Sequence, residues 1–174
     1  LTQPQFALCG QKTSFSHITA SENSGMIAAV LKTDGASALL HMPLNEITDT
    51  TISLTDIFKH WKNSEQEFTD CPDDISKIRM IENFLIKNIT FSSSCHEFFV
   101  KACVNEMKET KGMSLPYRSM ERFSLSERSL QRIFREQVGL SPKKFAEIVR
   151  LENSIALFRD GRAMTDICYE AGYY

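Results

Sequence analysis

Apolar residues recur every three or four positions through most of the chain after residue 70, which is the spacing of one buried face of an α-helix. A first helix is predicted to begin between Asp70 and Pro72, where carboxylates favour the positive end of the helix dipole. A second is predicted to begin at Cys95 and to end near Gly112, since glycine commonly follows a last helical turn. The polar residues 92–94 separate the two, so we place a domain boundary there. The apolar positions are Ile78, Ile81, Leu85 and Ile89 in the first helix, and Cys95, Phe98, Phe99, Ala102, Cys103 and Met107 in the second.

The first third of the chain has a different pattern. Its short apolar and β-branched segments predict strands at 5–9, 14–19 and 26–32, with turn-prone residues such as Asp34-Gly35 after them. Three short strands hold too little core to be stable alone, so we expect them to join a larger β-structure or to pack on the helices. A short helix is predicted from Ser53 to Trp61, with Ser53 as its cap.

The segment from residue 115 to residue 139 predicts a helix-turn-helix. A short helix is expected over 115–123, a tight break at Ser124-Leu125, and a longer helix over 126–138. Ser126 is a suitable N-cap for the longer helix, and Gly139 is a suitable stop.

The longer helix has one apolar side and one cationic side. With about 100° per residue and Leu130 at zero, Ile133 and Phe134 lie on the same side as Leu130. Arginine can bond guanine bidentately in the major groove, and glutamine can bond adenine in the same way. An ordinary amphipathic surface helix would show the same spacing, so the pattern alone leaves both interpretations open. The residues on the cationic side, at about 100° to 200° from Leu130 by the same rotation per residue, are Gln131, Arg135, Arg128 and Arg132.

A further long helix is predicted after this segment. Ser141 caps it and Pro142 occupies its first position, where proline is favoured. Its apolar residues spread over a wide arc, which predicts burial between two neighbours. Residues 163–174 begin one more short helix. This segment is similar to residues 115–125 and predicts a second helix-turn-helix that has lost its recognition helix. The wide arc consists of Phe145, Ile148, Val149, Leu151, Ile155 and Phe158.

Leu125 to Tyr174 resembles the DNA-binding domain of the AraC/XylS family of bacterial transcription regulators. The family's central-helix motif R-L-x-x-A is present, with Ser154 in place of the alanine. Its second motif, I-A-x-x-x-G-aromatic, is also present, with Cys168 in place of the alanine. Serine and methionine at 119–120 stand where the family usually has Leu-Ala. The family's first motif is S-x-x-x-L-x-R-x-F, followed by G-x-S-P. The residues that match the three motifs are Ser126, Leu130, Arg132, Phe134, Gly139, Ser141 and Pro142 in the first, Arg150 and Leu151 in the central helix, and Ile167, Gly172 and Tyr173 in the second.

The resemblance covers residues 95–174 and implies a fold. The expected class is α+β, mainly α: a small β-rich amino-terminal part and then a helical bundle with one complete and one incomplete helix-turn-helix. We expect a β-rich fragment of a sensor or dimerisation domain at 1–62, a helical connector at 63–94 and the DNA-binding domain at 95–174. We also expect the natural chain to continue at both ends. The front half resembles the barrel-like amino-terminal domain of one subgroup, at Pro4-Gln5-Phe6, Gly10, the Gly35 segment and Pro43-Leu44-Asn45-Glu46.

The resemblance also implies roles for side chains. Arg128, Gln131 and Arg132 are candidates for base edges. Arg135 and the backbone amides at the Ser126 helix start are candidates for phosphate. Two further residues, Lys143 and Lys144, would contact phosphate or remain solvated surface.

Charge is uneven along the chain. The net charge is −2, yet residues 118–150 hold 8 basic and 4 acidic residues, giving +4. This excess indicates a local polyanion contact or a solvated helix face. The five cysteines are odd in number and scattered, which argues against a disulfide framework and favours a reducing compartment; Cys95 and Cys103 are interpreted as core residues.

Other classes of function have less support. The chain carries no Walker loop, G-x-S-x-G or H-E-x-x-H motif, so we expect no enzyme, catalytic residue, cofactor or metal. No apolar run approaches the roughly 18 residues of a membrane span. Double-stranded DNA is the predicted partner, with an unknown small-molecule effector and a homodimer as further expectations, in the cytoplasm. An effector-sensing or oligomerisation module with little DNA binding remains the alternative.

Overall fold

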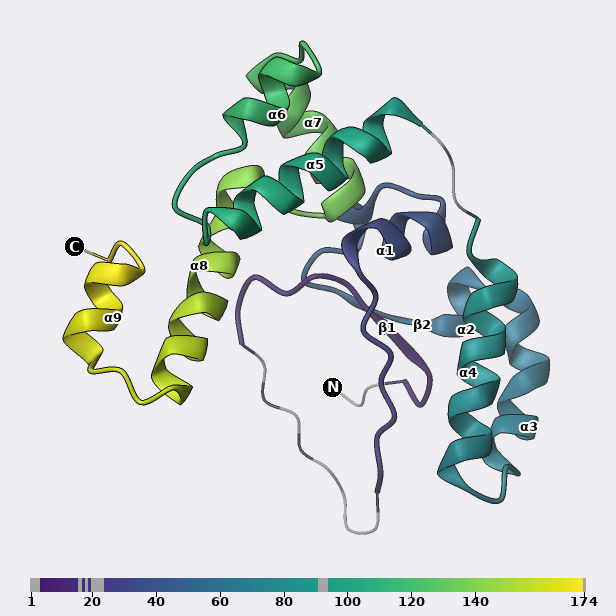
Figure 1. The fold of residues 1–174 in the computed structure, drawn as a ribbon. Coiled ribbons are helices and arrows are strands. Elements are labelled where there is room, and N and C mark those ends of the chain that lie inside the picture. The colour runs from purple at the N-terminus through teal and green to yellow at the C-terminus, as the bar shows by residue number, and fades with distance from the viewer. Residues whose placement is uncertain (1–3, 16, 18, 20–23, 91–93, 174) are drawn as a thin grey trace. The chain divides into compact units, whose positions relative to one another are not determined.

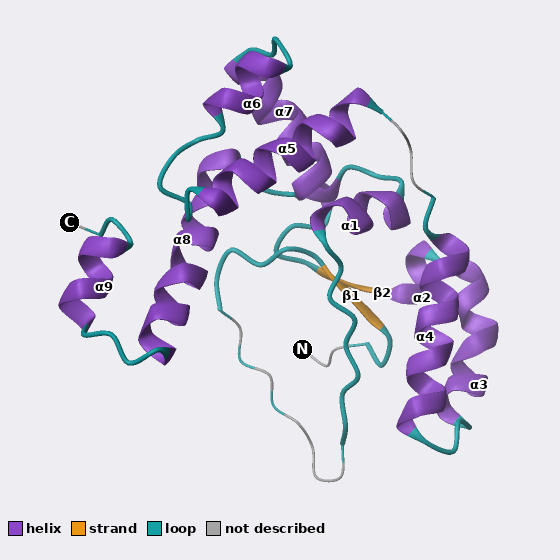
Figure 2. Cartoon of the chain, in the orientation of Figure 1, coloured by secondary structure: helices purple, strands orange, loops and turns teal. Residues whose placement is uncertain are grey.

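The computed structural model describes residues 4–173 except 16, 18, 20–23 and 91–93 (Figure 1). The chain divides into two compact units, Leu1–Ser92 and Ser93–Tyr174, called unit 1 and unit 2 below. Helices dominate the described residues, and a small two-stranded sheet lies in unit 1 (Figure 2). The prediction of an α+β, mainly α fold is therefore confirmed.

The sheet of unit 1 joins two short segments that are far apart in sequence. Strand β1 (Ala7–Cys9) pairs antiparallel with β2 (Thr51–Ser53), with Leu8 opposite Ile52. The strands predicted at 14–19 and 26–32 are wrong for the described residues of those segments; residues 16 and 18 lie outside them. Side chains such as Val30 are exposed there, and the two strands found among the described residues, β1 and β2, pair with each other.

The turn predicted at Asp34-Gly35 is also wrong, because both residues lie in a helix. Helix α1 spans Thr33–Leu40 and buries Leu39 and Leu40 against Leu44 and Ile47. Burial of its last turn outweighs the turn preference of its first residues. The other helical segments of unit 1 are η1 (Leu44–Glu46), α2 (Leu54–Ile57), η2 (Lys59–Asn63), α3 (Ser64–Thr69) and α4 (Asp74–Asn88).

The predicted helix from Ser53 to Trp61 is divided in two. Ser53 precedes α2 but makes no side-chain cap bond, and the backbone leaves the helical region at Phe58. This break turns Trp61 inward, where its ring meets Phe6 and Phe84 edge-on at centroid distances of 5.6 and 4.6 Å. Aromatic packing therefore decides the path of the chain here.

Helix α4 begins slightly later than predicted. Its cap is Asp73, whose carboxylate accepts a hydrogen bond from the Ser76 amide at 2.8 Å. That bond lowers the pKa of Asp73. Of the predicted apolar face, Leu85 and Ile89 pack on the core of unit 1, whereas Ile78 is exposed.

Three helices of unit 2 begin after a serine cap, which the sequence predicts at Ser126 and Ser141. Ser94, Ser126 and Ser141 each accept a hydrogen bond from the amide three residues further on, at 3.2 to 3.3 Å. The helices are α5 (Cys95–Glu109), α6 (Tyr117–Arg122), α7 (Glu127–Val138), α8 (Pro142–Arg159) and α9 (Met164–Glu170).

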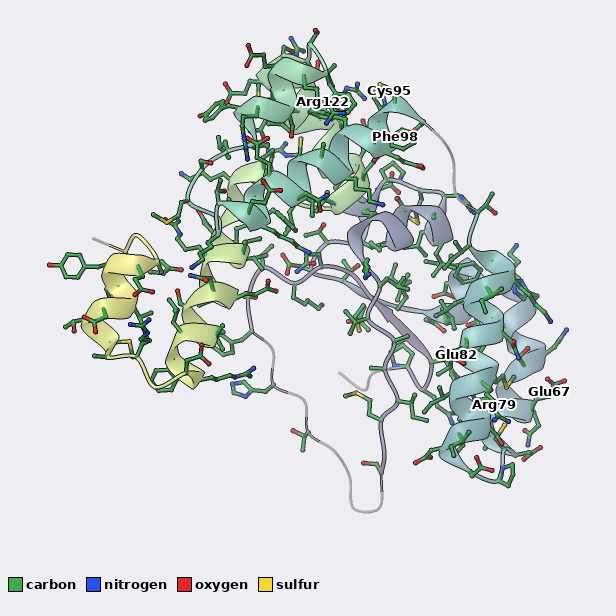
Figure 3. All side chains as sticks on the ribbon, in the orientation of Figure 1. Glu67, Arg79, Glu82, Cys95, Phe98 and Arg122 are labelled. Atoms are coloured by element: carbon green, nitrogen blue, oxygen red, sulfur yellow. The ribbon has the colours of Figure 1, made fainter. Side chains whose placement is uncertain are left out.

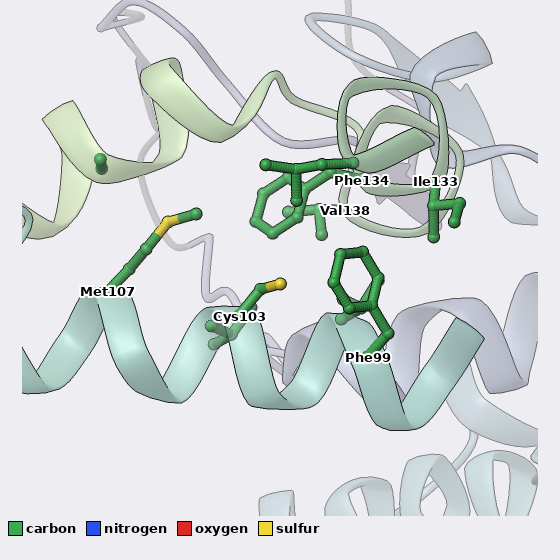
Figure 4. Close-up of a cluster of buried hydrophobic side chains, with 10 residues drawn as sticks. Phe99, Cys103, Met107, Ile133, Phe134 and Val138 are labelled. Atoms are coloured by element: carbon green, nitrogen blue, oxygen red, sulfur yellow. The ribbon is translucent and has the colours of Figure 1, made fainter. Parts of the chain in front are cut away.

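The core of unit 2 lies between α5 and α7. Figure 4 shows Phe99, Cys103 and Met107 of α5 pointing towards Phe134 and Val138 of α7, and all five are buried. The prediction of a buried Cys103 is confirmed. The same prediction for Cys95 is wrong, because this residue starts α5 and is exposed.

Helix α8 is buried only in part. Ala146 joins the core of unit 2, and Val149 is buried. Leu151, Ile155 and Phe158 are exposed. The predicted burial of the apolar residues of this helix is therefore wrong for the second half of α8. Helices α5, α7 and α9 all contact α8, and Ala146 near its start packs in the core of unit 2.

Candidate nucleic-acid interface

Helices α6 and α7 are joined by the tight turn that the sequence predicts. Ser124 adopts a left-handed conformation with φ of +52°. The Leu125 amide then donates to the carbonyl of Met120 at 3.0 Å, and the Leu125 side chain packs on the core. The turn thus ends α6 and begins α7 within residues 123–126, and Leu125 packs on the core that α5 and α7 share.

The two sides of α7 differ as predicted. Leu130, Ile133 and Phe134 are buried in the core. On the other side, Arg128, Arg132 and Arg135 are exposed and Gln131 is half-buried. These last four residues are called the α7 polar face below. Because the apolar side of α7 is covered, the polar face is the side available to a partner.

Two cationic side chains of the predicted site, Arg132 and Lys144, form ion pairs with carboxylates. The Nη1 atom of Arg132 lies 3.1 Å from a carboxylate oxygen of Glu136, one turn further along α7. The ammonium of Lys144 lies 3.3 Å from the carboxylate of Glu147. Exposed pairs at this spacing contribute only about 0.3–0.5 kcal/mol, so a phosphate can replace the carboxylate. Sequence reasoning missed Glu136, although its i, i+4 spacing from Arg132 was visible.

Three cations of the predicted site are not engaged in this way. Arg128, Arg135 and Lys143 form no ion pair with any residue in the part of the chain that the structure describes. All three side chains are exposed, and two of them belong to the α7 polar face. They are therefore ready to contact an anionic partner without first breaking an ion pair.

The start of α7 is capped by its own side chains. The Ser126 hydroxyl accepts from the Ser129 amide at 3.3 Å and lies 3.0 Å from the Ser129 hydroxyl. Glu127 follows in the first turn, where its carboxylate favours the helix dipole. A phosphate at this end would meet first-turn amides that the cap leaves open.

A buried carboxylate connects α5 to α6. Glu106 of α5 accepts hydrogen bonds from the Ser119 amide at 2.8 Å, the Ser119 hydroxyl at 2.7 Å and the Arg118 amide at 3.1 Å. Burial alone would raise the pKa of Glu106, but these bonds outweigh it and the pKa lies below its usual value. The carboxylate is therefore ionised at neutral pH. Sequence reasoning missed Glu106; an acidic residue among the core-facing positions of α5 was the available signal.

The neighbouring thiol is inert. Burial and the adjacent Glu106 charge raise the pKa of Cys103 to about 12. The thiolate is the reactive form of cysteine, so Cys103 acts as a small core residue.

Helix α9 is held to α8 by a residue of the family motif. Arg150 donates to the carbonyl of Gly172 at 3.4 Å, and its guanidinium lies 5.0 Å from the centre of the Tyr173 ring. Ile167 and Ala171 of this segment are buried. The motif residues of α8 and of the following segment therefore contact one another.

A short helix, a tight turn and a second helix with a cationic outer face define a helix-turn-helix domain of the DNA-binding class. Residues 120–174 match a family model described as a helix-turn-helix domain, which is of the AraC type. The match confirms the predicted resemblance and supports a DNA-binding regulator of the AraC type. The barrel-like resemblance of the front half stays a prediction.

The other comparisons add no relatives. No curated protein and no solved structure matches the chain. Among the described residues, no helix has both the length and the apolar character needed to cross a membrane.

Proposed function

We propose that the protein regulates transcription by reading a specific DNA sequence with α7 in the major groove. Arg128, Gln131 and Arg132 contact base edges, and Arg135 contacts phosphate. The single observation that supports this is the α7 polar face, in which the three arginines are exposed, on a helix whose opposite side is buried. The first-turn amides after Ser126, with Lys143 and Lys144 at the start of α8, form the proposed phosphate contacts beside it.

The test begins with a duplex selected from a random-sequence library by the purified chain. Binding of this duplex and of a random duplex is measured by fluorescence anisotropy over a range of salt concentrations. We expect tighter binding of the selected duplex and an affinity for both that falls with salt, because phosphate contacts release counterions. Failure to bind any duplex at low salt would overturn the proposal and favour an effector-sensing or oligomerisation module.

Replacing Arg132 with alanine is expected to weaken binding of the selected duplex by about 1–3 kcal/mol, the size of one lost base contact. The melting temperature should change little, because the lost Arg132–Glu136 pair is exposed and weak. Arg159→Ala, an exposed arginine at the end of α8, is the matched control and should bind like the parent. A large loss of stability with unchanged affinity per folded molecule would show that Arg132 is structural.

Replacing Glu136 with glutamine is expected to act in the opposite direction. The change removes a negative charge beside the proposed DNA contact and releases Arg132 from its intrahelical pair. We expect about twofold tighter binding, which corresponds to an exposed pair of this spacing. The salt dependence should also steepen, by roughly one counterion. Weaker binding than the parent would show that Glu136 orients Arg132 for contact.

For unit 1 we propose effector sensing or dimerisation, and the resemblance of its front half is the support for this role. Sedimentation of the chain at several concentrations, with and without the selected duplex, tests the dimer. A DNA-reading regulator of this type acts in the bacterial cytoplasm, which is the location we propose.

A further inference from the structure

Glu106 is the one charged residue among those that the structure describes as buried. Its side chain belongs to α5, yet the hydrogen bonds found for its carboxylate come from α6. Removing a carboxylate from water is costly unless several donors replace the lost hydration. An apolar residue of similar size would often serve stability equally well at such a position. The charge therefore calls for an explanation beyond core packing.

Helix α6 lacks a cap of its own. Its N-cap position is Pro116, whose side chain forms no cap hydrogen bond. The amides of Arg118 and Ser119 lie in the first turn, where no carbonyl of the same helix can accept from them. Glu106 accepts from both, so the cap of α6 is supplied from another helix.

The position of α6 determines the position of the turn before α7. The Ser119 carbonyl accepts from the Phe123 amide at 3.1 Å, and the Phe123 ring packs against Phe99 of α5 at a centroid distance of 5.4 Å. The next residues form the tight turn that leads into α7. A shift of the first turn of α6 would therefore reach the start of α7.

We infer that Glu106 is a positioning residue of the helix-turn-helix: its carboxylate sets the place of α6, and through the turn the angle at which α7 presents its polar face. This inference rests on the proposed DNA-binding function. Glu106 touches no DNA in this arrangement, since its carboxylate is buried between α5 and α6. Its contribution is to specificity, because base contacts depend on the angle of α7 more strongly than phosphate contacts do.

Glu106→Gln is the decisive variant. Glutamine has nearly the same shape, but one of its terminal groups is a donor and would face the donors of Ser119 or Arg118. The matched control is Glu109→Gln on the same helix. Glu109 is exposed and also bonds the Arg118 guanidinium, at 3.1 Å, whereas the amides of Arg118 and Ser119 donate to Glu106.

The readouts are the affinity per folded molecule for the selected and the random duplex, and hydrogen exchange at the amides of Arg118 and Ser119. For Glu106→Gln we expect a roughly tenfold loss of affinity for the selected duplex, about the size of one lost base contact. We also expect a much smaller loss for the random duplex, and faster exchange at both amides. Glu109→Gln should match the parent in all three.

The outcomes separate the two proposals. If the parent fails to prefer the selected duplex, the proposed function itself fails. If the parent binds and the folded Glu106→Gln variant retains its preference, the positioning role is overturned, even when its melting temperature falls. If Glu106→Gln does not fold, Ser119→Ala decides, because it removes the 2.7 Å hydroxyl bond and leaves the amide bond in place. A several-fold loss of preference supports the role, and an unchanged preference overturns it.

Discussion

Replacing Phe134 with alanine is expected to lower the free energy of unfolding of unit 2 by roughly 3–5 kcal/mol, the usual cost of truncating a buried phenylalanine. The Phe134 side chain is 0% exposed and lies at the centre of the contact between α5 and α7 (Figure 4). Its ring meets Phe145 of α8 edge-on at 5.5 Å, so the change opens a cavity where three helices meet. Urea denaturation followed by circular dichroism measures the loss.

The control for this prediction is Phe98→Ala. Phe98 is one position from the buried Phe99 on α5 but is 60% exposed. Figure 3 labels its side chain near Cys95 at the start of α5. Its removal takes away the same atoms without leaving a cavity, so the midpoint should change little. The single tryptophan, Trp61, lies in unit 1, and its fluorescence identifies the transition of that unit. An unchanged midpoint for Phe134→Ala would show that α7 is rotated from the described orientation.

Replacing Gly112 with alanine is expected to destabilise unit 2 by about 2–4 kcal/mol, from backbone strain together with overpacking. Gly112 follows α5 with φ of +73°, and its amide donates to the Met107 carbonyl at 2.8 Å. An added Cβ would overlap the carbonyl oxygen of Ala146 and lie 2.8 Å from the backbone nitrogen of Arg150. Both atoms belong to the backbone of α8, which cannot move aside as a side chain can.

Gly161→Ala separates the two causes of this loss. Gly161 also has a positive φ, +77°, but an added Cβ there would meet nothing within 4 Å. It should cost only the strain of the left-handed backbone, about 1–2 kcal/mol. Thermal denaturation of the two variants side by side gives the difference. Equal losses would contradict the close approach of α8 to Gly112.

The helices of unit 2 were predictable because their signals are local. A serine cap at Ser126, a glycine stop at Gly139 and three apolar residues on one side are all contained in one short stretch. Each of these acts over a single turn of helix, so no distant contact is needed to interpret it. The roles assigned to the residues of the α7 polar face remain predictions, which the DNA-binding experiments address.

The errors lie where distant contacts decide the outcome. Strand β1 pairs with residues more than 40 positions later, and nothing near either segment identifies its partner. The break at Phe58 depends on an aromatic cluster that includes Phe6 and Phe84. The second half of α8 is apolar in sequence, but only tertiary packing determines whether such residues are covered.

By itself, the sequence determined the helix limits of unit 2, the apolar side of α7 and the resemblance to AraC-type domains, because caps, helical periodicity and motif spacing are properties of neighbouring residues. Only the tertiary structure identified Glu106 as the cap of α6 and Gly112 as the point where α8 approaches α5. In both cases the partner is a backbone group far along the chain. A backbone amide or carbonyl has the same chemistry in every residue, so its position becomes evident only once the chain is folded.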